Sequence, residues 1–210
     1  SAERLYESKK HLNQNTHIIR HGTDWRHFRT AMDEATKIPV EIANLPKPII
    51  GFHGLLADWV DFALLKKTAE HFKNGSVVLV GKIAVDAEKK IKILDNISNI
   101  HFLGRKPYAE LPAYCKGFDV ALNPFEISEL TLAANPLKVR EYLAAGLQVV
   151  STDIPEVRIL EDCLVNLECS LKHSYDGGDH TIFVGEIENI TINEGNPLVY
   201  WKGDYRDFKI

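Results

Sequence analysis

Cysteine, methionine and long apolar runs are all scarce in this sequence. Only three cysteines occur among 210 residues, an odd number without metal-ligand spacing, which argues against a disulfide-stapled scaffold and against a metal site. No apolar run approaches the roughly 20 residues that cross a bilayer, and no signal peptide opens the sequence. We therefore expect reduced thiols, no metal, no transmembrane segment and a cytoplasmic location.

The charge balance is mildly acidic and unevenly spread. The formal net charge is −4, so no basic surface for nucleic acid is indicated and no nucleic-acid partner is expected. Basic and acidic residues balance up to residue 162, and the excess of acid falls after it. This asymmetry indicates two parts of different origin. Residues 1–10 look like the middle of a helix, so we expect a fragment of a longer protein.

From residue 48 onward, short apolar runs alternate with helical patterns. The apolar runs predict strands at 48–52, 76–80, 100–103, 118–122 and 147–151. Helices are predicted at 59–73, 84–94, 108–115 and 136–145, with a last one beginning near Pro155. Apolar strands separated by helices are typical of a parallel sheet covered on both faces. We therefore predict an α/β fold with a Rossmann-like parallel sheet.

The two ends of the chain follow other patterns. Residues 15–24 predict a strand and a turn, and prolines within 36–48 indicate a linker. The runs 165–172, 181–190 and 198–201 predict antiparallel strands, the first two joined by a hairpin turn at 175–179. We expect a crossing and linker at 1–46, the Rossmann-like domain at 47–162 and a short antiparallel β tail at 163–210. Exposed β edges in the tail would favour oligomers.

Glycines follow three of the predicted strands, at Gly54, Gly81 and Gly104. Ligands of parallel sheets bind at the carboxyl ends of the strands, although a turn alone would also explain each glycine. None belongs to a GxGxxG or Walker motif, so the common dinucleotide and ATP fingerprints are absent. With a helix beginning near residue 136, the three glycines together indicate a ligand rim.

The most informative segment runs from Asn135 to Val150. Lys138 and Glu141 lie three residues apart at the start of its amphipathic helix. A helix N-terminus attracts phosphate, a lysine there adds charge, and a carboxylate one turn away accepts two sugar hydroxyls. This combination suits a nucleotide diphosphate with its ribose. An ordinary surface Lys/Glu pair has the same spacing and remains the alternative.

Six motifs follow one another in the first part of the chain, at 15–24, 51–54, 78–81, 100–104, 118–124 and 135–146. In this order they resemble the carboxyl-terminal, donor-binding half of group 1 glycosyltransferases of the GT-B fold. The resemblance covers residues 1 to about 160. It implies transfer of a sugar from a nucleotide diphosphate sugar to an unknown acceptor, with no cofactor required.

The resemblance also implies roles for individual residues, while the catalytic residues stay unknown. Glu141 would bind the ribose hydroxyls and Lys138 the diphosphate. The backbone at Gly104 and Arg105 would meet the base. The other implied donor-binding residues are Gly54, Lys82 (equally a solvated turn lysine), and Asn135 and Pro136, whose neighbouring amides would face the donor.

The chain departs from the family pattern in three ways. Ala133 stands where many members have a second glutamate, and the loop 54–61 lacks the arginine and lysine that many members carry there. The amino-terminal acceptor half is missing. We therefore expect donor binding that relies on Lys138, without sugar transfer by this chain alone.

The tail carries motifs of another kind, at 167–170, 178–186 and 197–205. They resemble the end of flavin reductase-like domains, which bind FMN. The resemblance implies that Gly178, Asp179 and His180 meet NAD(P)H, while a hairpin-turn histidine is the alternative. A natural fusion, a chimera or a misjoined gene model would each explain the junction near Cys163. The alternative functions are therefore a fragment of an NAD(P)H-dependent flavin reductase and a non-catalytic interaction module.

Overall fold

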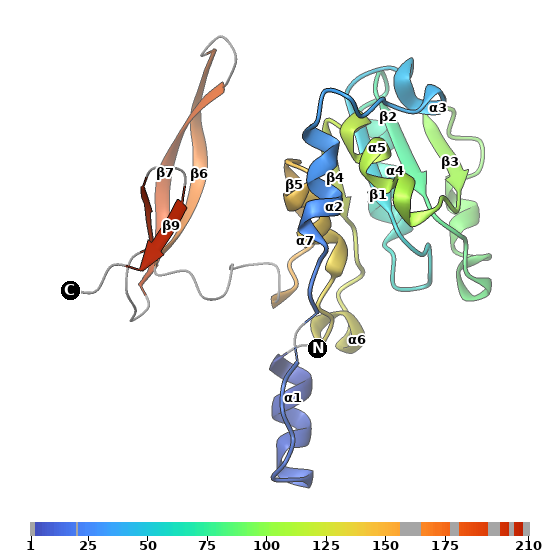
Figure 1. Ribbon diagram of the computed structural model, residues 1–210. Coiled ribbons are helices and arrows are strands. Elements are labelled where there is room, and N and C mark those ends of the chain that lie inside the picture. The colour runs from blue at the N-terminus through green and yellow to red at the C-terminus, as the bar shows by residue number, and fades with distance from the viewer. Residues whose placement is uncertain are drawn as a thin grey trace. The chain divides into compact units, whose positions relative to one another are not determined.

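The computed structural model describes residues 3–19, 21–155, 165–176, 181–192, 198–201 and 204–207. The chain divides into two units, Ser1–Arg158 and Ile159–Ile210. The first unit holds a parallel sheet with helices, and the described strands of the second are antiparallel (Figure 1). The predicted fold class is confirmed.

The sheet of the first unit has five parallel strands in the order β3-β2-β1-β4-β5. They are β1 (Ile49–His53), β2 (Ser76–Val80), β3 (Ile100–Gly104), β4 (Val120–Asn123) and β5 (Val149–Ser151). The order runs outward from β1 to β3 and then restarts on the other side of β1. The crevice at such a reversal is where doubly wound folds bind ligands. All five predicted strands are confirmed, with ends shifted by at most two residues.

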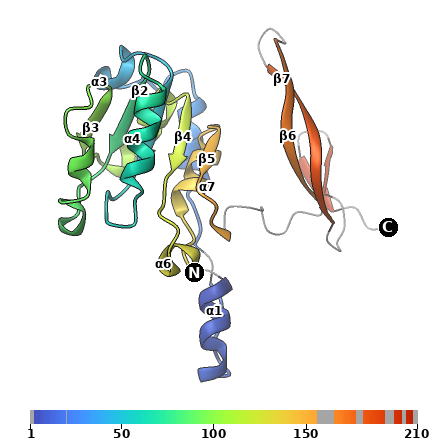
Figure 2. The same cartoon turned by 180° about the vertical axis from the view of Figure 1, so that it is seen from behind.

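Helices cover both faces of this sheet (Figures 1 and 2). One face carries α4 (Phe62–His71) and the 3₁₀ turns η3 (Val85–Ala87) and η4 (Ile91–Leu94). The other carries α2 (Trp25–Arg29), α3 (Val40–Ala43), α5 (Leu111–Gly117) and α7 (Leu137–Ala144). The remaining short elements are α1 (Glu3–Lys9), η1 (Lys10–Leu12), η2 (Thr30–Met32), η5 (Tyr108–Glu110) and α6 (Glu129–Leu132).

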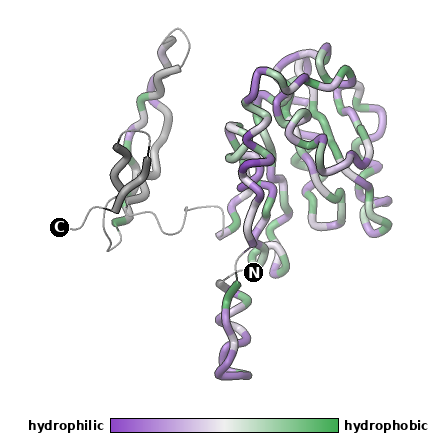
Figure 3. Tube along the Cα trace, in the orientation of Figure 1, coloured by the Kyte–Doolittle hydropathy of each residue, from purple (hydrophilic) through white to green (hydrophobic). Residues whose placement is uncertain are grey.

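Alternation along the strands divides the core between the two faces. Ile50 and Phe52 of β1 pack toward α4, in a cluster with Leu65. Ile49, with Val78 of β2, packs on the opposite face. Both faces of β1 and β2 are buried, which is why their sequences are apolar except for His53 and Ser76 at their ends. Figure 3 shows these central strands as mostly hydrophobic, while α1 is largely hydrophilic.

Two predicted elements differ from the structure. The predicted helix at 84–94 is two 3₁₀ turns, although Ala87, Ile91 and Leu94 are buried at helical spacing. The predicted strand near residues 15–19 is irregular, and Ile19 is exposed. β-Branched residues form a strand only where they can pair with a sheet, and residues 15–19 have no such pairing among the described strands. For residues 84–94, the periodicity correctly predicts which side chains are buried but does not determine the backbone hydrogen bonds.

Three short helices, α2, α3 and α6, were not predicted, and α2 and α6 have side-chain caps. Asp24 accepts a hydrogen bond from the His27 amide, at 3.1 Å, and begins α2. Ser128 and Thr131 form a capping box that begins α6. Helices this short offer too few residues for periodicity to be read.

The second unit contains two antiparallel pairs of strands. β6 (Val165–Asp176) pairs with β7 (Thr181–Ile192), and β8 (Leu198–Trp201) pairs with β9 (Asp204–Asp207). The predicted antiparallel tail is confirmed, and its first two strands are longer than expected. Gly178, Asp179 and His180 lie outside the described residues. Of the helix expected to begin near Pro155, only Pro155 is described, in helical conformation, and the residues from 156 to 164 lie outside.

Candidate functional site

A pocket of about 300 Å³ opens at the carboxyl ends of β1, β2 and β3. Its lining residues are His53, Gly54, Leu55, Val80, Gly81, Lys82, Arg105, Lys106 and Leu111. The pocket therefore brings together four residues singled out from the sequence, which are Gly54, Gly81, Lys82 and Arg105. Gly104 directly precedes Arg105 and turns the chain out of β3 with a φ of +66°.

Backbone contacts join the turns that follow β1 and β2. The Gly54 amide donates to the Val80 carbonyl at 2.9 Å, and the Leu56 amide donates to the Lys82 carbonyl at 2.9 Å. A Cβ on Gly81 would lie 1.7 Å from the Gly54 carbonyl oxygen. Glycine at position 81 is thus required for the close approach of the two turns that form this wall of the pocket.

Lys138 extends from the first turn of α7 to the turn at Gly54. A Cβ on Gly54 would meet the Lys138 Cε at 2.9 Å, and Gly54 has a φ of +139°. The Lys138 Nζ lies 5.3 Å from the ring centroid of Phe52 and 4.4 Å from that of Phe125. These are cation–π distances. The aromatic rings thus hold the ammonium group at the turn that lines the pocket.

Burial lowers the pKa of Lys138 to about 8, and the negative charge of Glu141 opposes part of this effect. Within the described part of the chain, no hydrogen bond or ion pair engages the Lys138 ammonium group. A partly desolvated cation without a hydrogen-bonding partner is stabilised more by an anionic ligand than a solvent-exposed lysine is.

Glu141 lies one turn further along α7, next to the end of β1. Its Oε2 is 3.6 Å from the Nε2 of His53, and its side chain is 13% exposed. Burial raises the pKa of Glu141, while the charges of Lys138 and His27 counteract the rise. The structure therefore brings Lys138, Glu141 and Gly54 together around His53.

Helix α7 begins at Leu137, with Pro136 at its N-cap. Pro136 has no N–H group, so the donors expected near it come only from its neighbours. The amides of the first helical turn, at Leu137 and Lys138, have no intrahelical acceptor. The side-chain nitrogen of Asn135 is buried and finds no hydrogen-bond partner in the described part of the chain. This end of α7 therefore presents first-turn amides and the Asn135 side chain as hydrogen-bond donors beside the Lys138 cation.

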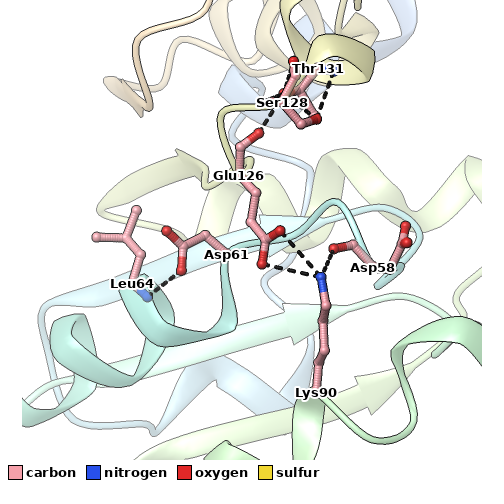
Figure 4. A network of polar contacts seen from close by, with 7 residues as sticks. All are labelled: Asp58, Asp61, Leu64, Lys90, Glu126, Ser128 and Thr131. Carbon is pink, nitrogen blue, oxygen red and sulfur yellow. Dashed lines mark hydrogen bonds and ion pairs between the residues drawn. The ribbon is translucent and has the colours of Figure 1, made fainter.

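The loop after β1 is acidic and is held by a polar network on the α4 side (Figure 4). Lys90 Nζ donates to the Asp58 carbonyl at 2.8 Å and forms an ion pair with Glu126 at 3.2 Å. The Glu126 amide donates to the Trp59 carbonyl at 2.8 Å. This network connects the loop to the segment that contains Phe125, one of the two rings at Lys138. Of the acidic residues in the loop, Asp58 contributes its backbone carbonyl, and Asp61 caps α4 by accepting a hydrogen bond from the Leu64 amide at 2.8 Å.

The pocket receives its positive charge from elements other than that loop. Lys82 follows β2 and Arg105 follows β3, and both are exposed. Lys106 is paired with Glu41 at 2.7 Å, and this hydrogen bond raises the pKa of Lys106. Lys82 and Arg105 are therefore the bases most available to an anion at the pocket, together with Lys138.

His53 is the site residue that was not singled out from the sequence. It is 4% exposed and ends β1, where its ring packs against Phe28 and Tyr142. Burial, and secondarily the charge of Lys138, lower the pKa of His53 to about 3. It lies within the motif at 51–54, but the motif gives no sign that α7 packs on its side chain.

Acid should destabilise the fold through His53. Its pKa is lowered to about 3 in the folded state, so below about pH 6.5 only the unfolded chain takes up the proton. The free energy of unfolding should then fall by about 1.4 kcal/mol per pH unit between roughly pH 6 and 4 from this group. Urea unfolding at several pH values would measure the slope. A His53→Phe variant should lose that part of the slope, and an unchanged slope would contradict the assignment.

Neither a metal-binding cluster nor a membrane-spanning helix is found among the described residues. No group of three or more His, Cys, Asp or Glu in this part of the chain is placed to hold a metal ion. None of the helices described here is long and apolar enough to cross a membrane.

Comparison with known proteins matches this chain to two kinds of protein. A protein of Bacillus subtilis strain 168 that bears the name of a teichuronic acid biosynthesis glycosyltransferase, TuaH, is 28% identical over 184 residues, which are 87% of this chain and 44% of TuaH. The structure of sucrose-phosphate synthase from Thermosynechococcus elongatus matches with a TM-score of 0.50 and 16% identity, over 75% of this chain and 41% of that one. This structural likeness concerns the fold alone.

The flavin reductase like domain family matches residues 123–209. An NADH-dependent flavin reductase of a Rhodococcus species is 39% identical over 54 residues, which are 26% of this chain and 31% of the relative. The family match begins at the end of β4 and crosses α6, α7 and β5, which belong to the parallel-sheet unit. The chain spans less than half the length of these curated relatives. It resembles a GT-B glycosyltransferase in its parallel-sheet unit and a flavin reductase-like domain toward its carboxyl end.

Proposed function

We propose that the parallel-sheet unit binds the nucleotide diphosphate part of a sugar donor at the pocket and along the first turns of α7. The observation that carries this proposal is the convergence of two α7 side chains on the end of β1. Lys138, which has no hydrogen bond to any described residue, reaches Gly54, and the largely buried Glu141 reaches His53. The name of the TuaH relative, a glycosyltransferase, supports the same reading.

The diphosphate would lie at the N-terminus of α7. Lys138 supplies a fixed charge there, and the first-turn amides supply donors aligned with the helix dipole. Lys82 and Arg105 border the same pocket and extend its positive field. Positive charge fixed in advance stabilises the negative charge that develops on a departing diphosphate.

The ribose would lie beside Glu141. An ionised carboxylate accepts hydrogen bonds from two adjacent hydroxyls. Lys138 favours the ionised form of Glu141, opposing the effect of burial on its pKa. The base would then lie toward Gly104 and Arg105, at the end of β3. Transfer of the sugar would further require an acceptor-binding half, and we propose donor binding for this chain.

The Glu141→Ala variant should bind ribonucleoside diphosphates about tenfold to a hundredfold more weakly than the wild type. Loss of hydrogen bonds to a charged group costs about 1.5–3 kcal/mol, and about 1.4 kcal/mol corresponds to a factor of ten in affinity. Isothermal titration calorimetry with UDP, ADP and GDP would measure the change and identify the preferred base.

Glu70→Ala provides the matched control for this variant. Glu70 lies on α4 and makes an exposed pair with Lys66 at 3.8 Å, so its removal should leave nucleotide affinity unchanged. Failure of all three nucleotides to bind the wild-type chain would refute the proposal. Equal affinities of the wild type and Glu141→Ala would show that Glu141 does not contribute to nucleotide binding.

A second candidate function is flavin reduction, favoured by the family match at 123–209. Residues 123–155 of that span form part of a parallel sheet with helices, so FMN would have to rely on the antiparallel strands that follow. Titration with FMN, followed by flavin absorbance and fluorescence, tests this candidate. A chain that leaves the flavin spectrum unchanged would exclude it.

A further inference from the structure

His53 occupies a position between β1 and α7 that donor binding, as proposed above, leaves without a role. Its backbone amide donates to the Tyr142 Oη at 2.8 Å, and its ring Nε2 lies 3.6 Å from the Glu141 Oε2. Two consecutive residues of α7 therefore meet one residue at the end of β1. This double contact fixes α7 against the strand at the point where Glu141 projects.

The orientation of the His53 ring is set by packing on two sides. The Phe28 ring stacks on it with centroids 5.8 Å apart and an interplanar angle of 12°. The Tyr142 ring meets it edge to face at 4.6 Å. A ring held in this way cannot turn its nitrogen away from Glu141 without repacking the core.

The Nε2 atom of His53 is buried and has no hydrogen-bond partner among the residues that the structure describes. Leaving a buried polar atom unsatisfied costs free energy, so such an atom in a native structure needs an explanation. The Glu141 carboxylate lies beside this atom, but their separation of 3.6 Å exceeds hydrogen-bond length. A small rotation of the Glu141 side chain toward His53 would close that gap.

We propose that His53 is a positioning residue for Glu141. With its proton on Nε2, neutral His53 donates to one carboxylate oxygen of Glu141 when ligand enters, and so turns the carboxylate toward the ribose hydroxyls. This inference rests on the proposed donor binding. It assigns the preference for ribose over deoxyribose to the pair Glu141 and His53 together.

The test compares ribonucleoside diphosphates with their 2′-deoxy forms. Calorimetric titrations of UDP, ADP, GDP and the three 2′-deoxy counterparts would be made on the full chain. The wild type should prefer ribose by about tenfold or more, since the deoxy ligand leaves a carboxylate contact unmade. His53→Phe should lose most of this preference by weakening the ribose ligand alone. His53→Gln, which carries an amide N–H near the Nε2 position, should keep it.

A double variant separates positioning from a general structural role. In the Glu141→Ala background, adding His53→Phe should change neither affinity further, because the positioned group is gone. The inference is overturned if His53→Phe weakens both ligands equally or keeps the ribose preference, or if His53→Gln loses it. Should His53→Phe fail to fold, His53→Met replaces it as the variant without a donor.

Failure of this inference is distinguishable from failure of donor binding. If Glu141→Ala abolishes the ribose preference and His53→Phe does not, only the role of His53 is wrong. If the wild type binds none of the six nucleotides, donor binding and the role of His53 fail together.

Discussion

Replacing Lys138 by methionine should weaken nucleoside diphosphate binding by about a hundredfold and make the unliganded protein more stable. Removing a charged partner of a diphosphate costs about 2–3 kcal/mol, and this sets the loss of affinity. The gain in stability follows from the lowered pKa of Lys138, since burial makes its charged form unfavourable in the folded state.

The pKa gives an upper limit for that gain. One pKa unit corresponds to about 1.4 kcal/mol, so the shift from 10.5 to about 8 limits it to about 3 kcal/mol, and contact of the half-buried side chain with water reduces it. Methionine keeps the length of the side chain and packs well against rings such as Phe52 and Phe125. A variant that is more stable and yet binds poorly would show that Lys138 is kept for its ligand.

The pH dependence of wild-type binding provides a second readout of Lys138. Its affinity should fall as the pH rises above about 8, where the ammonium group loses its proton. Calorimetric titrations between pH 6.5 and 9.5 would follow this loss, and Lys138→Met should show a weaker dependence. Lys66→Met is the matched control, because Lys66 lies on α4 in an exposed pair with Glu70. Unchanged affinity of Lys138→Met would contradict a role of Lys138 in binding the diphosphate.

Replacing Gly81 by alanine should destabilise the first unit by about 3 kcal/mol or more. The added methyl group would lie 1.7 Å from the Gly54 carbonyl oxygen, and a backbone atom cannot move aside as a flexible side chain can. Overpacking of this kind commonly costs 1–3 kcal/mol, and occasionally more. If the protein still folds, the Gly54 turn must move away, and Lys138 loses the surface against which it packs.

Gly22→Ala is the control for Gly81→Ala. A Cβ at Gly22 would meet no atom within 4 Å, so its effect on stability should stay within about 0.5 kcal/mol. Urea unfolding followed by circular dichroism would compare the two variants with the wild type. A Gly81→Ala protein as stable as Gly22→Ala would show that the turns after β1 and β2 do not approach as closely as described.

The sequence predicts the sheet well because a strand that is buried on both faces has a nearly continuous run of apolar residues. Ser76–Val80, for example, is a short apolar run with a glycine after it, and it forms β2 over the same residues. The region after β2 was less accessible to prediction. Its buried Ala87, Ile91 and Leu94 have helical spacing, yet the backbone forms two 3₁₀ turns, and spacing alone does not determine the hydrogen-bond pattern.

Only part of the candidate site can be predicted from the sequence. Lys138 and Glu141 stand out because both lie on one helix, where local spacing sets their distance. The Phe52 and Phe125 rings at Lys138, and the His53 ring at Glu141, come from strand ends and loops far away in the chain. Such contacts depend on how β1, β4 and α7 pack, and no local pattern encodes that arrangement.

The placement of the donor nucleotide is tested most directly by a crystal structure of this chain with the tightest-binding nucleoside diphosphate. We expect the diphosphate at the N-terminus of α7 within hydrogen-bond distance of the Lys138 Nζ. We also expect the ribose hydroxyls on the Glu141 carboxylate. A nucleotide bound elsewhere, or bound in this pocket without contact to Lys138 and Glu141, would contradict the account.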